Sequence, residues 1–530
     1  MKQFIILTVF HLLFINIGIT QKVPYNIEWS KCYGGTGYEY LFSTINTNDS
    51  GHISAGYTNS NDGDVKGLHG LSDAWVLKTA GNGTLDWQKC FGGTGIDEFK
   101  CVQKTKDGGF VFAGFSTSND GDLTNNNGKS DVWVVKTDNY GNIEWQKNYG
   151  GSNDEQAQYI QQTNDDGFII VGWTNSYDGD VTGNHRRLGV VSEDVWVIKI
   201  DNIGNIQWQK CYGGSDDDVG ASILQTKDRG YIILGGTNSN DGDVNGNHGN
   251  LDVWVVKINS LGNIQWQKCY GGSLGDDANS FQITMDDGYI IAGGTSSNDG
   301  DVNGFHGGNG DAWVFKIDSI GNVEWQKCFG GSKSDYANSI IQTVDGGYFF
   351  GGSTFSYNGD VNSNHIGNAW VVKLDNKANI EWQNVYGGSN EEQLYSVVQI
   401  NKDEYLFAGD TYSNDGDVHG NHSKNKTDAW IVKLSSEILK YPEPIKILGT
   451  NNQLNVFPNP SYGFVQIQIN NLKEIRILDV LGRIYLKKII DINNLSAYTN
   501  LNIQYLARGM YIIQAICIDG SIKVAELMVE

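Results

Sequence analysis

The stretch that decides the fold is residues 205–262, NIQWQKCYGGSDDDVGASILQTKDRGYIILGGTNSNDGDVNGNHGNLDVWVVKINSLG. Four short runs in it read as strands, at 205–210, 222–226, 231–235 and 252–257, the first with strict alternation of polar and apolar residues. The Gly- and Asn-bearing turns at 227–230 and 259–263 have hairpin length, and a long polar loop at 238–248 separates the last two strands. The stretch therefore predicts a four-stranded antiparallel sheet.

This unit occurs seven times, with spacings from 57 to 63 residues, and tryptophans recur at two fixed positions in it. One series of tryptophans lies in segments like Ile-x-Trp-Gln-Lys-Cys-Tyr-Gly-Gly: Trp29, Trp87, Trp145, Trp208, Trp266, Trp325 and Trp382. The other lies in Asp-Ala/Val-Trp-Val-Val-Lys: Trp75, Trp133, Trp196, Trp254, Trp313, Trp370 and Trp430. A long period of short strands and Gly-rich turns indicates a solenoid, an array or a propeller.

The ends of the repeat favour a closed ring over an open array. An open edge would expose unpaired backbone. The first unit begins with the Trp29 strand, whereas the last unit ends on the Trp430 strand, so residues 27–33 can complete the blade that begins near Glu392. The sequence therefore predicts an all-β fold: a seven-bladed propeller over 27–434, with four strands per blade and an N-terminal strand closing the last blade.

The repeat resembles a known group of bacterial propeller repeats. Its motifs Tyr-Gly-Gly-Ser-x-x-Asp-Asp, Asp-Gly-Gly-Tyr-Ile-Ile-Ala-Gly and Asp-Ala-Trp-Val-Phe-Lys-Ile-Asp are similar to those of SBBP and delta-60 repeats. That resemblance implies the fold. It implies no ligand, because these repeats have no common activity.

Both ends of the chain lie outside the repeat. Residues 1–20 read as a secretory signal peptide, with Lys2 before the apolar run from Phe4 to Ile19. A proline-marked linker is expected at 435–450, followed at 451–530 by alternating strands and Gly turns that suit a small β-sandwich. No later stretch is apolar for about 20 residues, so we expect no transmembrane segment in the mature chain.

The C-terminal segment resembles the type A sorting domain of type IX secretion cargo. The motifs that carry this resemblance lie at 455–460, 475–483 and 506–513. It implies Sec-dependent entry into the periplasm, type IX export through that machinery, and release or attachment at the outer cell surface. The alternative is an ordinary adhesion module.

Charge and cysteine usage narrow the classes of partner. The formal net charge is −23, which repels nucleic acid and anionic lipid and suits cations or neutral ligands such as glycans. Five of the seven cysteines occupy one repeat position, where equivalent atoms on neighbouring blades lie too far apart for a disulfide. We expect them to be small buried side chains.

Two acidic patterns recur in every unit. An acid precedes each inner strand, where it could either ring the mouth of a central channel or fasten a tight loop through backbone N–H groups. These acids are Glu39, Asp97, Glu155, Asp218, Asp276, Asp335 and Glu392. Asp-Gly-Asp loops are candidate Ca²⁺ sites, with plain Asx-turn loops as the alternative. Their residues are Asp62, Asp64, Asp120, Asp122, Asp178, Asp180, Asp241, Asp243, Asp299, Asp301, Asp360, Asp415 and Asp417, with Asn358 before Asp360.

The third unit breaks the symmetry. It is the longest, with the insertion His185-Arg186-Arg187-Leu188-Gly189-Val190-Val191-Ser192-Glu193, and Trp173 is unique to it. The candidate ligand contacts are therefore Trp173, Arg186, Arg187 and Glu193, and the alternative is a neutral loop variant. Six of the seven units also place a histidine after the Asp-Gly-Asp loop, which favours loop packing over a shared metal.

These observations favour a binding module over an enzyme. Enzymes need a few differently tuned groups that converge, which a repeated ring does not supply. A sialidase would need an arginine cluster, but the repeats contain only Arg186, Arg187 and Arg229. We expect a non-enzymatic secreted or surface-displayed propeller that binds protein or glycan through its acidic face. The alternative is a secreted, calcium-dependent carbohydrate-active hydrolase.

Overall fold

The computed structural model describes residues 25–123, 126–185, 192–361, 367–436, 454–457, 464–468, 472–479, 484–489, 499–503, 506 and 509–529. Within them no helix has the length and apolarity needed to cross a membrane. The chain divides into two compact units at residue 438, and each is described by itself.

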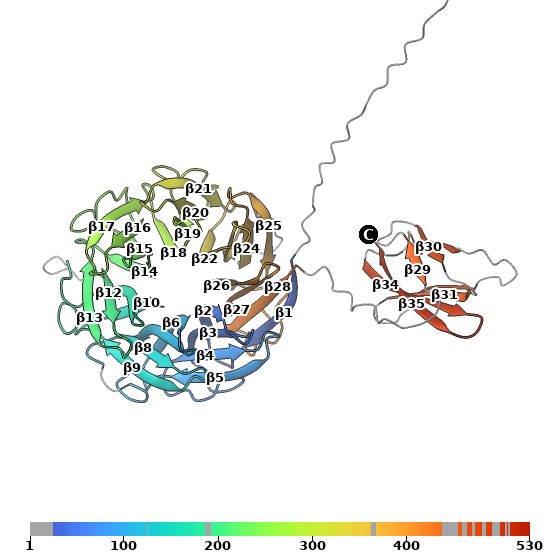
Figure 1. Ribbon diagram of the computed structural model, residues 1–530, viewed down its shortest axis with the longest axis horizontal. Coiled ribbons are helices and arrows are strands. Elements are labelled where there is room, and N and C mark those ends of the chain that lie inside the picture. The colour runs from blue at the N-terminus through green and yellow to red at the C-terminus, as the bar shows by residue number, and fades with distance from the viewer. Residues whose placement is uncertain are drawn as a thin grey trace, which may run out of the picture. The chain divides into compact units, whose positions relative to one another are not determined.

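The first unit is a ring of seven four-stranded antiparallel sheets, as the sequence predicts (Figure 1). The innermost strands are β2 (Glu39–Asn46), β6 (Asp97–Lys104), β10 (Glu155–Gln162), β14 (Asp218–Gln225), β18 (Asp276–Ile283), β22 (Asp335–Gln342) and β26 (Glu392–Asn401). The second strands are β3 (His52–Thr58), β7 (Phe110–Ser116), β11 (Phe168–Thr174), β15 (Tyr231–Thr237), β19 (Tyr289–Thr295), β23 (Tyr348–Thr354) and β27 (Glu404–Thr411). In each blade the innermost strand lies nearest the central axis, and the other three strands follow outward in order.

The third and fourth strands complete each blade. The third strands are β4 (Asp73–Thr79), β8 (Asp131–Thr137), β12 (Asp194–Ile200), β16 (Asp252–Ile258), β20 (Asp311–Ile317), β24 (Asn368–Leu374) and β28 (Asp428–Ser435). The outermost strands are β5 (Leu85–Phe91), β9 (Ile143–Tyr149), β13 (Ile206–Tyr212), β17 (Ile264–Tyr270), β21 (Val323–Phe329), β25 (Ile380–Tyr386) and β1 (Asn26–Tyr33).

The N-terminal strand closes the ring, which confirms the predicted interlock. β1 pairs antiparallel with β28, from Asn26 opposite Ser435 to Tyr33 opposite Ala429, and completes the sheet β1-β28-β27-β26. The Trp430 indole donates to Ser30 Oγ over 2.8 Å, and Ser30 Oγ donates to the Asp417 carbonyl over 2.7 Å. Strand and side-chain hydrogen bonds therefore join residues about 400 apart in the sequence.

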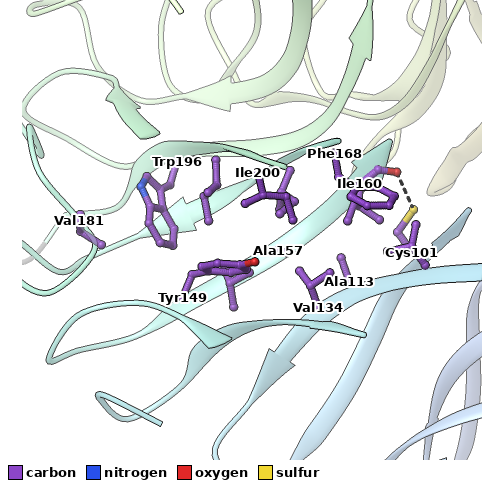
Figure 2. Packing of buried hydrophobic residues seen from close by; sticks show 14 of the residues in the cluster. Cys101, Ala113, Val134, Tyr149, Ala157, Ile160, Phe168, Val181, Trp196 and Ile200 are labelled. Atoms are coloured by element: carbon purple, nitrogen blue, oxygen red, sulfur yellow. Dashed lines mark hydrogen bonds between the residues drawn. The ribbon is translucent and has the colours of Figure 1, made fainter. Parts of the chain in front are cut away.

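The core lies between the blades. Every residue of the third strands is buried, because neighbouring blades cover both faces of each sheet. Their tryptophans are almost completely buried, and each indole N–H has a side-chain acceptor on the outermost strand, as Trp75 has in Gln88. Figure 2 shows the packing between the second and third blades, where Cys101, Ala113 and Val134 meet Ala157 and Phe168.

A bulge in each innermost strand shapes the channel. In β2 the pairing with β3 skips Phe42, between Leu41 and Ser43, and the same skip recurs in the other six blades. A bulge leaves one residue unpaired and re-aims its side chain. The glycine opposite the bulge allows the strands to approach, because a Cβ on Gly56 would lie 1.8 Å from the Tyr40 carbonyl oxygen. The unpaired residues line a central channel of about 890 Å³.

The second unit contains two antiparallel sheets. One is β29 (Asn455–Phe457), β30 (Phe464–Gln468) and β33 (Thr499–Asn502), and the other is β32 (Ile484–Ile489), β31 (Leu472–Asp479), β34 (Gly509–Cys517) and β35 (Ile522–Val529). Apolar side chains from both sheets, among them Val465, Ile475, Leu501 and Ile513, form one buried cluster. This arrangement agrees with the predicted small β-sandwich.

Candidate functional site

The seven acids are the first residues of the innermost strands, and their side chains bind the preceding loops instead of lining the channel. All seven are completely buried. Glu39 accepts a hydrogen bond from the Gly35 N–H over 3.0 Å and one from the Thr58 hydroxyl over 2.7 Å. Asp97, Glu155, Asp218, Asp276, Asp335 and Glu392 accept the equivalent loop N–H bonds. Burial raises the pKa of Asp218 to about 6 and that of Glu39 above its ordinary value. These contacts correspond to the loop-fastening alternative.

The Asp-Gly-Asp residues join neighbouring loops. Asp62 Oδ1 accepts the Thr36 N–H over 2.7 Å, and the Asp64 N–H donates to the Gly34 carbonyl over 2.8 Å. The glycine between them, Gly63, has φ near 63°, a left-handed conformation that L residues with a side chain seldom adopt. The other units repeat these contacts, with Asn358 in place of the first aspartate in the sixth. Among the described residues, no three or more His, Cys, Asp or Glu side chains are grouped as metal ligands would be.

Five of the recurring histidines pair with the aspartate that begins the third strand of their blade, and the sixth, His365, lies outside the described residues. His422 Nδ1 lies 2.5 Å from Asp428 Oδ2, and its Nε2 lies 3.8 Å from Asp64 Oδ2. His69, His185, His248 and His306 make the same first contact with Asp73, Asp194, Asp252 and Asp311. Hydrogen bonding to Asp194 raises the pKa of His185. The histidines therefore pack loops, as expected, but the aspartate of the Asp-Ala-Trp motif was not recognised as their partner.

The candidate contacts of the third unit separate into two places. Trp173 is a half-buried residue of β11, opposite Gln156 on the innermost strand. Glu193 is half-buried in the loop before β12, and its N–H donates to Asp217 Oδ1 over 3.1 Å. Burial and the nearby Asp217 charge raise the pKa of Glu193. Arg186 and Arg187 lie outside the described residues.

Three positions in each blade differ in residue type from blade to blade, whereas the residues around them repeat. Every second strand contains the motif Gly-x-Thr/Ser, in which x pairs with the residue that follows the loop acid. This residue x is Tyr57, Phe115, Trp173, Gly236, Gly294, Ser353 or Asp410. The residue after each loop acid is Tyr40, Glu98, Gln156, Val219, Asp277, Tyr336 or Gln393. The bulge residue is Phe42, Lys100, Gln158, Ala221, Asn279, Asn338 or Tyr395. The residues around these positions are fixed by packing and hydrogen bonds, whereas the seven bulge residues, together with Val219, line the channel.

Aromatic side chains from two blades and a lysine from a third meet at one end of this channel. The rings of Tyr40 and Tyr57 stack at 4.9 Å between centroids, and Phe42 meets Tyr395 of the seventh blade edge to face at 5.4 Å. Lys100 Nζ of the second blade lies 4.0 Å from the centre of the Phe42 ring, a cation–π contact. Tyr40, Tyr57 and Tyr395 are each only half-buried. A continuous aromatic patch at a partly open surface is typical of a recognition site.

An acid is buried beneath the patch. Asp410 is 2% exposed, and its Oδ1 has no hydrogen-bond partner. Burial raises its pKa to about 8, although hydrogen bonding with the Tyr395 hydroxyl lowers the pKa. Asp410 is therefore largely protonated at neutral pH, so it can donate as well as accept a hydrogen bond.

The other charges at the mouth are compensated locally. Lys100 Nζ pairs with Glu98 Oε2 at 2.6 Å, and Asp277 Oδ1 accepts the Gly294 N–H over 2.8 Å. The mouth thus has little free charge, in contrast to the chain, whose net charge is −23. The fourth blade supplies only Val219, Ala221 and Gly236, so bulky groups are concentrated on the opposite side.

Sequence analysis identified Trp173 in this region but missed the others. The signal was present: within Gly-x-Thr/Ser, the middle residue alone ranges from Gly to Trp. Period-2 alternation could not place the bulge residues in the channel, because the bulge shifts the register of the innermost strand.

Comparison with known proteins agrees with the division of the chain. Residues 455–529 match the model of the secretion system C-terminal sorting domain. No curated protein matches the sequence.

Several solved structures are similar at low identity. A protein of unknown function from Dyadobacter fermentans DSM 18053 is 10% identical, over 78% of this chain and 99% of its own, with a TM-score of 0.41. The Neurospora crassa Pan2 WD40 domain is 11% identical, over 78% of this chain and 97% of its own, with a TM-score of 0.44. YCF48 bound to a D1 peptide is 8% identical, over 78% and 94%, with a TM-score of 0.38. Similarity at this level concerns the fold alone.

The chain thus carries a sorting domain that marks proteins exported by the type IX system to the cell surface or the medium.

Proposed function

We propose that the chain is a non-enzymatic binding or adhesion module for protein or glycan, and that the ligand contacts the mouth of the propeller channel. One observation carries the proposal: the repeat changes residue type at the bulge position of every blade, and all seven bulge residues line one channel. Large partly exposed aromatic rings at a concave surface typically supply much of the binding energy of an interface.

The proposal places the ligand at a different set of residues from the acidic loops. The loop acids are buried or occupied by loop N–H groups, as Glu39 is by Gly35 and Asp62 by Thr36. The mouth opens on the same face as these loops, because Tyr40 directly follows Glu39 and Tyr57 lies two residues before Asn59. Export to the cell surface or the medium would bring this face into contact with extracellular material. The SBBP and delta-60 resemblance is compatible with this proposal and specifies no ligand.

The test is binding of the labelled full-length mature protein to arrays of extracellular-matrix proteins and polysaccharides. The variant Phe42→Ala removes the ring that contacts both Tyr395 and Lys100. The matched control is Tyr140→Ala, which removes a ring that is 67% exposed in the turn between β8 and β9. We expect Phe42→Ala, and not the control, to lose binding to at least one component. Equal binding by both variants would contradict the proposal.

Hydrolysis of the bound polysaccharide is assayed in parallel, since a carbohydrate-active hydrolase is the alternative. If the protein releases reducing ends from the polysaccharide and substitution of one acidic residue abolishes this activity, the protein is an enzyme and not a binding module.

A further inference from the structure

The side chains around the channel mouth restrict the chemistry of a ligand. The first restriction is charge. Glu98 is paired with Lys100, Asp277 accepts a backbone N–H, and Asp410 is 2% exposed. A charged ligand bound here would lose hydration without a free opposite charge to replace it, which is costly. The mouth therefore disfavours both strongly anionic and strongly cationic ligands.

The second restriction is the combination of amides and aromatic rings. The bulge residues Gln158, Asn279 and Asn338 each present an amide to the channel, and a side-chain amide has two donor hydrogens and an acceptor oxygen. Asn338 Nδ2 already donates to the Leu394 carbonyl over 2.8 Å, so Asn338 retains one donor hydrogen and its acceptor oxygen. The aromatic rings lie across the opening from the small residue Ala221. Amides match adjacent hydroxyl groups, whereas an aromatic face packs against the C–H face of a sugar ring.

The third restriction is the buried acid. Asp410 Oδ1 has no partner, although unpaired buried polar atoms are rare in folded proteins. Because Asp410 is only 2% exposed, a ligand cannot reach this atom directly, so the acid adds no accessible charge to the opening. The Tyr395 hydroxyl donates to Gln393 Oε1 over 2.6 Å, and its oxygen can still accept a hydrogen bond from a ligand hydroxyl.

We propose that the channel mouth binds a neutral sugar chain, packed against the Phe42 and Tyr395 rings and hydrogen-bonded by the amides of Gln158, Asn279 and Asn338. This inference rests on the proposed binding function and narrows it from protein or glycan to glycan. The open side at Ala221 gives the sugar chain room, since the fourth blade has no large side chain at the three variable positions.

The test is isothermal titration of the full-length mature protein with hexasaccharides that differ in charge. The neutral probes are β-1,4-glucan, β-1,4-xylan, β-1,4-mannan, α-1,4-glucan and N-acetylated chitin hexamers, and the charged probes are a galacturonic acid hexamer and a fully deacetylated chitosan hexamer. We expect at least one neutral hexamer to bind at least tenfold more tightly than either charged probe. Its affinity should change little between 50 and 500 mM NaCl, because no ion pair forms.

Two variants locate the site. Phe42→Ala should weaken binding at least tenfold, and Ala221→Trp should do the same by filling the open side while every aromatic residue is retained. Tyr140→Ala serves as the control and should leave the affinity unchanged. Melting curves check that each variant is folded, and two variants with opposite changes in volume keep the test informative if one fails to fold.

The outcomes separate this inference from the proposed function. Absence of binding to every neutral hexamer, tighter binding of a charged probe, or equal effects of all three variants would overturn the sugar assignment. If Phe42→Ala nevertheless loses binding to a matrix protein on the arrays, the binding function stands and the ligand is a protein. Loss of neither interaction would refute both.

Discussion

The buried carboxyl group of Asp410 makes the propeller less stable as the pH rises. Its pKa is raised from 3.8 to about 8 by burial in the folded protein, so the folded state holds a proton that the unfolded state releases. The stability that this group contributes is fully present below pH 3.8 and is lost as the pH rises through about 8. Replacing Asp410 by Asn keeps the shape and removes the ionisation.

The expected size follows from the pKa difference. Each pH unit between the two pKa values corresponds to about 1.4 kcal/mol. Between pH 6 and pH 8 the free energy of unfolding of the wild-type protein should therefore fall by about 2 kcal/mol because of Asp410, and the variant Asp410→Asn should not show this decrease. For a ring of this size, with an unfolding entropy of about 2.1 cal/mol/K per residue, this is a shift of about 2 °C in the melting temperature.

The assay is a thermal melt of both proteins at half-unit steps from pH 6 to pH 8. Other groups titrate in this range, since burial also raises the pKa of Asp131 and Asp311 to about 6, so the informative quantity is the difference between variant and wild type. Asp216→Asn, at an exposed loop acid, is the control. A difference in melting temperature between Asp410→Asn and wild type that stays constant over this range would refute the reasoning.

Four further outcomes are expected. Deleting residues 26–33 leaves the β28 edge unpaired, so the protein should aggregate or melt many degrees lower by light scattering and calorimetry, and an unchanged melt would contradict the interlock. Truncation after residue 438 in a type IX-competent host should leave a folded propeller in the periplasm, and its normal appearance in the medium would refute the sorting role. Millimolar CaCl₂ should raise the melting temperature relative to EGTA, but only slightly, because Ca²⁺ must compete with existing loop hydrogen bonds. MgCl₂ should have no such effect, nor should CaCl₂ on the variant Asp243→Asn. Identical melting curves with CaCl₂ and EGTA would mean that the loops have a purely structural role. His422→Ala should lower the free energy of unfolding, measured with urea, by about 1–3 kcal/mol, because it leaves Asp428 buried without its side-chain donor. A change near zero would contradict the role of His422 as that donor.

The recurring tryptophans show why the sequence alone predicts the propeller architecture. Trp75 and its six equivalents recur with a period close to 58 residues, and each needs a fully buried site with an acceptor for its indole N–H. A four-stranded sheet supplies such a site only when sheets cover both its faces, so the repeat implies stacked blades. The missing outer strand of the last unit implies that residues 27–33 fill it, and β1 does so.

The roles of the recurring acids could be narrowed but not decided from the sequence. Glu39 and its equivalents are compatible with a ring or with a loop fastener, because the choice depends on which way a side chain at the end of a strand points. The structure turns all seven inward, where the glycine N–H groups of the loop are their donors. His422 similarly finds Asp428 through loop packing that no linear spacing encodes.

Local patterns in the chain itself determine the repeat, the four strands of each blade, the closure of the ring and the separate C-terminal unit, because alternation, turn residues and chain ends act over short distances. Only the tertiary structure decides the candidate site. Phe42, Lys100 and Tyr395 belong to different blades and are far apart in the sequence. They come together because the bulge turns one residue of each innermost strand into the channel, and because ring closure brings the seventh blade beside the first. Convergence of this kind depends on the whole ring, and no segment of the sequence contains it.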